Sequence, residues 1–361
     1  MGFKTFATFR PMKENYFDFL NRTLIVAAVV VTFFLIWYLS SVVLIVFGAI
    51  ILAMLLRLGA HPLTQGLALP EPIALIVSGL LILFAIAGTG YVFGSHLASE
   101  FQDVVRRTVS ASNSIEARLQ TSSFGQFLLN HFFGGNLALS DVLPSLLKVS
   151  ANFLEAVVIA IISAAYLAAQ PRLYRNGVIW LFPPDKHARA AEIFDGIAEA
   201  LRLWLLGQLL EMILIGALST FAVWMIGIPS PLALGLIASI GEFVPYLGPI
   251  IAAIPALLVA ITKSPDAVLW IALAYFLIHQ LESQIVAPLI QRHMVSIPPA
   301  VTLLGIVAVT SLFGGVAIIF AAPITVVIFA AVNLLYVRET LGEKTALTRK
   351  LADHGRRSHI P

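Results

Sequence analysis

The stretch Gly241-Glu242-Phe243-Val244-Pro245-Tyr246-Leu247-Gly248-Pro249 interrupts an apolar run that extends from Pro231 to Thr262. Each proline removes a backbone donor and clashes with the preceding helical turn, and Gly248 adds conformational freedom at the same place. At membrane depth, freed backbone groups are tolerated only where they are buried in protein or line a water-filled cavity. The stretch therefore predicts a membrane-spanning helix that is broken near its middle, beside a polar cavity.

A second apolar run, 300–337, is interrupted at Phe313-Gly314-Gly315. Both breaks follow a proline at a similar distance, because Pro231 precedes Gly248 by 17 residues and Pro299 precedes Gly314 by 15. Paired interrupted helices indicate the midplane binding site of a transporter. The spacings do not match closely enough to indicate an internal repeat.

The composition places most of the chain in lipid. Of the 361 residues, 59% are hydrophobic and 11% are charged, with a mean hydropathy of +0.95, whereas soluble domains carry about 25% charged residues. Cysteine is absent, which excludes disulfides, Cys-ligated zinc and thiol catalysis. We therefore predict an all-α, polytopic integral membrane protein with about eight transmembrane helices, two of them interrupted in the C-terminal half.

Charge and proline positions divide the chain into spans and surface segments. A hairpin at Ser40-Ser41 divides the first charge-free run, which is too long for a signal-peptide core. The predicted spans are 23–40, 41–58, 73–94, 151–170, 205–227, 231–262, 267–289 and 300–337. The predicted parts are a cytoplasmic N-terminal segment (1–22), helices 1–3 (23–94), an extracytoplasmic amphipathic insert (95–150), helix 4 (151–170), a cytoplasmic amphipathic segment (171–204), the transport core of helices 5–8 (205–337) and a cytoplasmic tail (338–361).

The basic residues predict the orientation. With eight spans, one face carries 17 of the 22 lysines and arginines, and the other carries 5. Cytoplasmic loops are enriched in such residues. We therefore expect a protein of the inner (plasma) membrane with both termini in the cytoplasm. The enrichment of cytoplasmic loops in basic residues also accounts for the net charge of +3, so we expect no nucleic acid as a partner.

Three acidic residues, Glu211, Glu242 and Glu282, fall within or near apolar runs. A carboxylate at the bilayer centre costs about 2.5–3.5 kcal/mol on insertion scales. Each of the three must therefore be paired, protonated or in contact with water. An aqueous cavity between helices would accommodate all of them.

Neighbouring polar residues extend this set. Gln208 lies three residues from Glu211, and His279 lies one turn from Glu282. Taken alone, each side chain fits an interhelical hydrogen bond or an interfacial position equally well, but as a set they predict a solvated path. The predicted substrate or ion pathway comprises Gln208, Glu211, Glu242, Pro245, Tyr246, Gly248, Pro249, His279, Gln280, Glu282 and Gln284. The predicted helix breaks and hinges are Gly241, Pro255, Pro288, Pro298, Pro299, Phe313, Gly314, Gly315 and Pro323.

The order of several motifs resembles the autoinducer-2 exporter (AI-2E) family of bacterial transporters, closely from about 201 to 327 and by helix arrangement upstream. The motifs are Gly207-Gln208, Gly227-Ile228-Pro229, Val244-Pro245-Tyr246-Leu247-Gly248-Pro249, Ile254-Pro255, Gln284-Ile285-Val286-Ala287-Pro288, Ile297-Pro298-Pro299-Ala300-Val301, Phe313-Gly314-Gly315 and Ala321-Ala322-Pro323. The chain departs from the family pattern at Ala317, where many members have a second glycine, and at Leu289, where a basic residue is frequent. These departures leave the transported species open.

The resemblance implies eight spans, helical hairpins that form a mobile transport unit, a homopentamer and elevator-like movement. Members of this family are described as exporters of autoinducer-2 or as sodium or lithium/proton antiporters. The first hypothesis is therefore a secondary transporter that exports a small polar solute such as this quorum-sensing signal, and the alternative is an antiporter.

Other functional classes fit the sequence less well. The chain has no Walker A pattern for ATP, no H-E-x-x-H zinc helix and no Gly-x-Ser-x-Gly elbow. We therefore expect no enzyme activity, no cofactor and no metal site. An envelope assembly protein, with 95–148 as its partner-binding part, would leave the two broken helices and their acidic residues unexplained.

Overall fold

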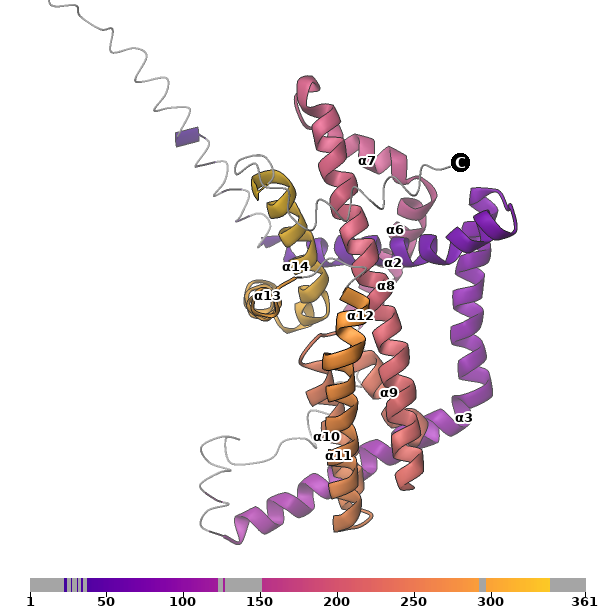
Figure 1. Cartoon of the computed structure of the whole chain (residues 1–361), viewed down its shortest axis with the longest axis vertical. Helices are drawn as coiled ribbons and strands as arrows, with labels where there is room; N and C mark the ends of the chain where they lie inside the picture. Colours follow the sequence, from indigo (N-terminus) through magenta and orange to yellow (C-terminus); the bar gives the residue numbers. More distant parts are fainter. Residues whose placement is uncertain are drawn as a thin grey trace, which may run out of the picture.

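The computed structural model describes residues 38–122, 151–291 and 297–337, together with the single residues 23, 24, 27, 31, 34 and 126. All regular structure in this part of the chain is helical, which confirms the predicted all-α fold. The α-helices are α2 (Ser40–Gly66), α3 (Glu71–Gln120), α6 (Ala151–Ala169), α7 (Pro171–Ile179), α8 (His187–Ile226), α9 (Pro231–Gly241), α10 (Gly248–Ile261), α11 (Pro265–Leu281), α12 (Ala287–Gln291), α13 (Pro299–Phe313) and α14 (Ile318–Val332) (Figure 1). Short 3-10 or π turns are η1 (Pro184–Lys186), η2 (Glu282–Val286), η3 (Gly315–Ala317) and η4 (Asn333–Val337).

Several of these helices can cross a membrane. Four are long and apolar enough to do so, namely Ser40–Gly66, Pro184–Ile226, Pro265–Ile290 and Gly315–Leu335. A fifth candidate is the pair α6–α7, which is bent by 87°. Shorter apolar helices, among them α9, α10 and α13, fall below the roughly 20 residues of one span. The chain is therefore a multi-pass membrane protein whose C-terminal half contains paired short helices.

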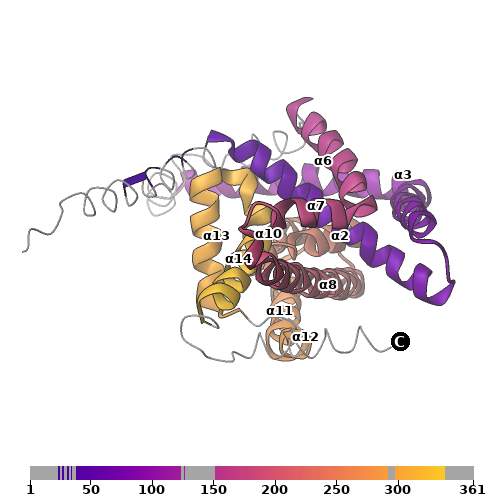
Figure 2. The same ribbon diagram turned by 90° about the horizontal axis from the view of Figure 1, so that it is seen from above.

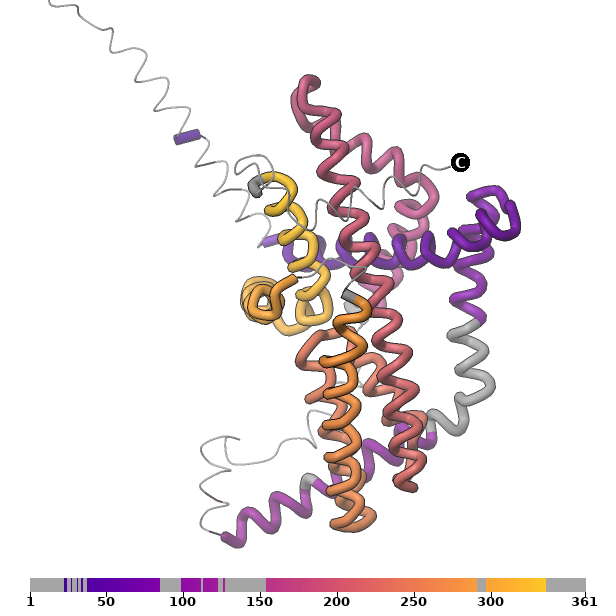
Figure 3. Tube along the Cα trace, viewed as in Figure 1, coloured from indigo at the N-terminus to yellow at the C-terminus, as the bar shows by residue number. Residues whose placement is uncertain are grey.

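The 40-residue helix α8 lies at the centre of the molecule. Viewed from above, α13 and α14 lie on one side of it and the N-terminal part of α3 on the other (Figure 2), while α11 runs beside its lower half (Figure 3). We predicted a surface segment (171–204) and a separate span after it, but helix α8 continues from the second half of that segment to the end of the span without interruption at residue 204. No proline interrupts α8, and good helix formers such as leucine occupy the junction. The helix ends only at Gly227, whose φ of 72° is left-handed.

The helices α8 and α9 approach closely because glycines face each other. A side chain on Gly235 would collide with Thr220 and with the carbonyl of Gly216, and a side chain on Gly216 would collide with Ser239. The hydroxyl of Thr220 donates a 2.8 Å hydrogen bond to the carbonyl of Gly216 in its own helix. Small residues thus let the backbones approach, as in other membrane helix pairs.

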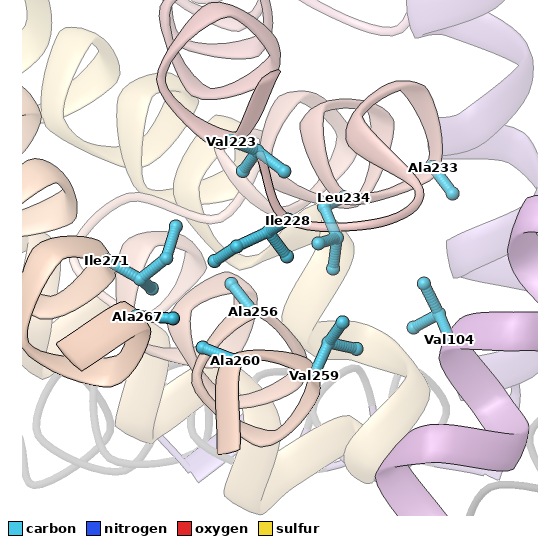
Figure 4. Packing of buried hydrophobic residues seen from close by; sticks show 10 residues of the cluster. All are labelled: Val104, Val223, Ile228, Ala233, Leu234, Ala256, Val259, Ala260, Ala267 and Ile271. Atoms are coloured by element: carbon cyan, nitrogen blue, oxygen red, sulfur yellow. The ribbon is translucent and has the colours of Figure 1, made fainter. Parts of the chain in front are cut away.

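The largest buried apolar cluster joins this pair to three further helices. It contains Val223, Ile228, Ala233, Leu234, Ala256, Val259, Ala260, Ala267, Ile271 and, from α3, Val104 (Figure 4). Its members come from both legs of the α9–α10 hairpin and from the elements that flank it. The cluster therefore fixes the hairpin against α3, α8 and α11.

Two charged contacts from α3 reinforce the base of the hairpin. The carboxylate of Glu100 accepts a 2.9 Å hydrogen bond from the N–H of Ala233, in the first turn of α9. The guanidinium of Arg107 donates a 3.2 Å bond to the hydroxyl of Thr262, the residue after α10. A negative group at a helix N-terminus and a positive one at a C-terminus both complement the helix dipole. The same arginine and Arg106 pair with Asp103, and their hydrogen bonds hold the pKa of that carboxyl below its usual range.

A third charged contact ties the hairpin to α8. The Nζ of Lys263 donates hydrogen bonds to the carbonyls of Ile226 at 2.9 Å and Gly227 at 2.6 Å. These carbonyls lie at the C-terminus of α8, where unsatisfied acceptors and the dipole favour a cation. Both ends of the hairpin are thus bonded to neighbouring helices, opposite its tip at 242–247.

Some predicted boundaries differ from the observed ones. Helix α2 begins at Ser40 and extends to Gly66 rather than to residue 58. The helices continue through Pro255 in α10 and Pro323 in α14, so these prolines do not break them. A proline removes only one hydrogen bond from a helix interior, and apolar packing of the helix can compensate for it. The segments 1–22, 127–150 and 338–361 lie outside the described residues.

We expect Gly235→Ala to destabilise the protein by about 1–3 kcal/mol, because the new methyl group would overpack the contact between α8 and α9. Thermal unfolding of the detergent-purified protein measures this effect. The matched control is Gly177→Ala in α7, where no atom lies within 4 Å of the place that the new methyl group would occupy. This control should stabilise the protein by about 0.5–1 kcal/mol through helix propensity. Equal effects of the two substitutions would contradict the close packing.

Candidate functional site

The first predicted break is present between α9 and α10. Helix α9 ends at Gly241, helix α10 begins at Gly248, and the connecting residues form tight turns. Within the turns, the N–H of Val244 donates to the carbonyl of Gly241 at 3.0 Å, and the N–H of Gly248 donates to Val244 at 2.8 Å. The break therefore satisfies part of its own backbone and reverses the chain into a helical hairpin.

Two features show that this tip is tightly constrained. A side chain on Gly248 would collide with the backbone of Gly241, so the two helix ends touch through glycine. Tyr246 has a φ of 66°, a left-handed conformation that is uncommon for a bulky residue. Such backbone outliers cluster at ligand clamps and switch regions.

The second predicted break is also present. Helix α13 ends at Phe313, and Gly314 follows with φ 86° and ψ 174°, a conformation that is essentially restricted to glycine. The N–H of Gly314 donates to the carbonyl of Thr310 at 2.9 Å, and the N–H of Ala317 donates to Gly314 at 3.0 Å. Leu247, at the tip of the first hairpin, packs against the apolar cluster that contains Phe313 and Ala317. The two breaks therefore share one side-chain contact surface.

Glu242 is the buried charge of the first break. Only 2% of its surface is exposed. Its backbone carbonyl accepts a 2.7 Å hydrogen bond from the buried Nε2 of Gln208 in α8. Its carboxylate lies next to that of Glu282 and within electrostatic range of Glu211. Among the described residues, no donor reaches the Oε2 atom of Glu242.

A π turn positions Glu282. The N–H of Ala287 donates to the carbonyl of Glu282, five residues back, and this widened turn precedes Pro288. The Nδ1 of His279 lies 3.1 Å from the Oε2 of Glu282, so the imidazole can bond this carboxylate. Single π turns inside α-helices occur frequently at functional sites.

Three acidic side chains therefore converge from three elements, which are α8, the hairpin tip and η2. Three ionised carboxylates in a low-dielectric site repel one another strongly. Binding a proton or a cation between them relieves this repulsion. In the described residues, no group of three His, Asp or Glu side chains has the geometry of a metal site.

The cluster reaches the surface on one side. The ring of Tyr246 lies within electrostatic range of Glu211 and Glu282 and is 40% exposed. The side chain of His279 is 46% exposed, whereas that of Glu282 is 14% exposed. The tyrosine and the histidine are thus the exposed polar side chains nearest to the acidic residues in this part of the site.

The structure does not bring every predicted residue into this cluster. The side chains of Gln280 and Gln284 are exposed and make no hydrogen bond among the described residues. Pro288 lies in α12 directly after the π turn, and Pro298 and Pro299 lie at the start of α13. Pro245 and Pro249 are half-buried at the hairpin tip, and Gly315 is exposed in the turn η3.

The sequence did not predict several contacts that support the site. The rings of Trp204 and Phe243 meet edge to face with centroids 5.9 Å apart, and the hydroxyl of Tyr275 lies beside Ser219. For the first contact, the available signal in the sequence was Phe243, an aromatic residue within the break that could pack on a tryptophan. The π turn also had a signal, since Pro288 removes a helical donor just beyond Glu282.

A multi-pass helical membrane protein with two adjoining helix breaks and buried acidic residues belongs to the class of transporters rather than to that of soluble or single-span proteins. Residues 25–336 match the model of the family described as "AI-2E family transporter". The chain belongs to this family.

Three curated proteins are similar to the chain. It is 33% identical over 163 residues to "Putative transport protein YrrI" of Bacillus subtilis, a match that covers 45% of the chain and 46% of that protein. It is 26% identical over 258 residues to a "Putative transport protein" of Thermotoga maritima, which covers 70% and 78%. It is 24% identical over 165 residues to "Putative transport protein YueF" of Bacillus subtilis, which covers 46% and 45%. The matches thus span about half the length of the two Bacillus relatives.

We expect Gln208→Leu to destabilise the protein by about 1–3 kcal/mol, because the buried carbonyl of Glu242 would lose its donor. Chemical denaturation in detergent, followed by tryptophan fluorescence, measures the change. The matched control is Gln280→Leu, an exposed glutamine of α11, which should stay within about 0.5 kcal/mol of the parent. A Gln208→Leu variant as stable as this control would contradict a structural role for the bond.

Proposed function

We propose that this protein is a proton-coupled secondary transporter that moves a small polar solute across the bacterial inner membrane. The observation that supports this function is the buried Glu242 carboxylate, which has an unbonded oxygen and lies beside Glu282 at a helix break. A proton bound between the two carboxylates lowers the charge of the pair from −2 to −1 and removes their mutual repulsion. The charge state of the hairpin tip then changes with the proton gradient.

The coupling mechanism follows from electrostatics. Two adjacent carboxylates repel each other when both are ionised and hydrogen-bond when they share one proton. Loss of the proton to the side of lower proton concentration separates Glu242 from Glu282 and shifts the tip relative to α8 and η2. Because Leu247 packs on the second break, the movement extends to α13 and α14. By family resemblance, we propose that the movement is elevator-like and that the protein acts as a homopentamer.

The proposed solute is a small hydroxylated molecule, of which autoinducer-2 is the candidate named in the family's description. Tyr246 and His279 supply exposed polar groups near the acidic residues, and Gln208 supplies a buried amide beside Glu242. Broken helices also present backbone donors and acceptors to a ligand. Direct export of this signal is thus compatible with the polar groups at the tip.

The second candidate function is sodium(lithium)/proton antiport. It is favoured by the same acidic cluster, because exchange needs a carboxylate that binds a proton and a cation in turn. Glu211 lies within electrostatic range of Glu282, so a third carboxylate is available to attract a cation. The envelope assembly hypothesis gains no support from this site.

The proposed topology places both termini in the cytoplasm and the substrate or ion pathway at the first break. The pathway residues proposed on geometry are Gln208, Glu211, Glu242, Tyr246, His279 and Glu282, flanked by the hinge residues Gly241, Gly248 and Gly314.

We expect Glu242→Gln and Glu282→Gln each to reduce proton-driven flux at least about tenfold, because an amide cannot exchange the coupled proton. The purified protein is reconstituted into vesicles with an imposed pH gradient. Uptake of labelled autoinducer-2 and of sodium is measured in parallel, together with internal pH. Solute-linked proton movement supports the first function, and sodium-linked proton movement supports antiport.

The matched control is Glu199→Gln in α8, whose carboxylate pairs with Arg202 one turn away. Its flux should equal that of the parent protein. Undiminished flux of all tested solutes in both cluster variants would exclude the carboxylates from coupling and would refute the proposed mechanism.

A further inference from the structure

The helix α7 leaves α6 at a right angle. The 19 residues of α6 extend about 28 Å at 1.5 Å per residue, which matches the roughly 30 Å hydrocarbon core of a bilayer. At Pro171 the chain turns by 87° into α7. If α6 spans the bilayer upright, α7 runs along the bilayer surface at the end of that span.

The inner face of α7 is attached to the protein. The Nε of Arg175 donates a 2.5 Å hydrogen bond to Asp195 of α8, and Ile179 is buried. These residues are four apart and therefore lie on one side of the helix. The opposite side faces away from the rest of the chain.

That outward side is a continuous apolar surface, which we call the outer stripe. Its residues recur at helical spacing (i, i+1, i+4, i+5, i+8) and are Leu173, Tyr174, Gly177, Val178 and Leu181. Leu173 is 61% exposed and Leu181 is 84% exposed. Gly177 has open space around it, so the middle of the stripe is not covered by any described residue.

Unpaired cations and a tryptophan border the outer stripe. Arg172 and Lys186 are exposed, and neither has an ion pair or a side-chain hydrogen bond within the described residues. Trp180, next to the stripe, is 75% exposed. Aromatic and basic residues of this kind are enriched at the boundary between hydrocarbon and headgroups, and basic residues there attract anionic lipids.

We propose that α7 is an interfacial helix whose outer stripe enters the boundary between headgroups and acyl chains, with Arg172 and Lys186 binding the phosphates of anionic phospholipids. The charge and the right-angled turn favour this partner. A re-entrant position in the hydrocarbon would bury Arg172 at considerable cost. A protein partner would leave the two exposed cations and the exposed tryptophan that flank the stripe unexplained. The inference is independent of the transported solute.

Spin labelling tests the position of α7, and the absence of cysteine makes each introduced thiol unique. The full-length protein carries single substitutions Leu173→Cys, Gly177→Cys or Leu181→Cys, and the flank control is Asn176→Cys. In phosphatidylcholine–phosphatidylglycerol vesicles, the accessibility to oxygen relative to a water-soluble nickel complex should be at least about threefold higher in the stripe than at 176, as expected for burial about 5–10 Å into the interface. Nickel accessibility equal to that at 176 would place the stripe in water, and shielding from both probes would place it against protein. Either result overturns the proposal.

A second measurement tests the anionic headgroup. The combined substitution Arg172→Gln and Lys186→Gln should reduce the phosphatidylglycerol retained by the purified protein in native mass spectrometry by about fivefold or more. Retention of phosphatidylcholine should not change. The control Arg118→Gln removes an exposed cation of α3 and should have a smaller effect. Equal phosphatidylglycerol retention by the double variant and the parent would overturn the role of the two cations.

Discussion

The burial of the Glu242 carboxylate is the constraint to which the C-terminal half of the molecule conforms. A charge at 2% exposure has to be held near groups that can neutralise it, since an isolated buried charge is very costly. The helix break places it between α8 and η2, and the Gln208 bond fixes the backbone that carries it. The widened turn brings Glu282 to the same place. The position of the helix break and the proposed proton binding therefore both depend on the Glu242 side chain.

The α9–α10 hairpin has two unlike ends. At its base, Glu100, Arg107 and Lys263 complement helix termini with charged hydrogen bonds, and the largest apolar cluster packs beside them. At its tip, Tyr246 has a left-handed backbone conformation, Gly241 and Gly248 touch each other, and the side chain of Glu242 is buried. Because the base of the hairpin is bonded to neighbouring helices and its tip is strained, we expect a conformational change to occur in the tip rather than in α9 and α10.

The sequence predicts those features that depend on local chemistry. Proline and glycine determine where α9 and α13 stop, so both breaks could be located within a few residues, and the cost of charge in lipid marked Glu242 and Glu282. Features that depend on tertiary contacts could not be predicted. The Glu100 contact joins residues 133 positions apart, and Gln284 shares its spacing with inward residues but is exposed. The continuity of α8 past residue 204 was not predicted, because the change in polarity there suggested a boundary. A helical backbone can continue through such a change.

The hairpin tip has two kinds of attachment. The bond from Gln208 is directional and short, so it tolerates little displacement before it breaks. The contact of Leu247 with the cluster around Phe313 is non-directional, so it contains no single bond that must break when the tip shifts. A displacement of the tip would therefore cost the Gln208 bond first, while the apolar contact would still link the tip to the second break.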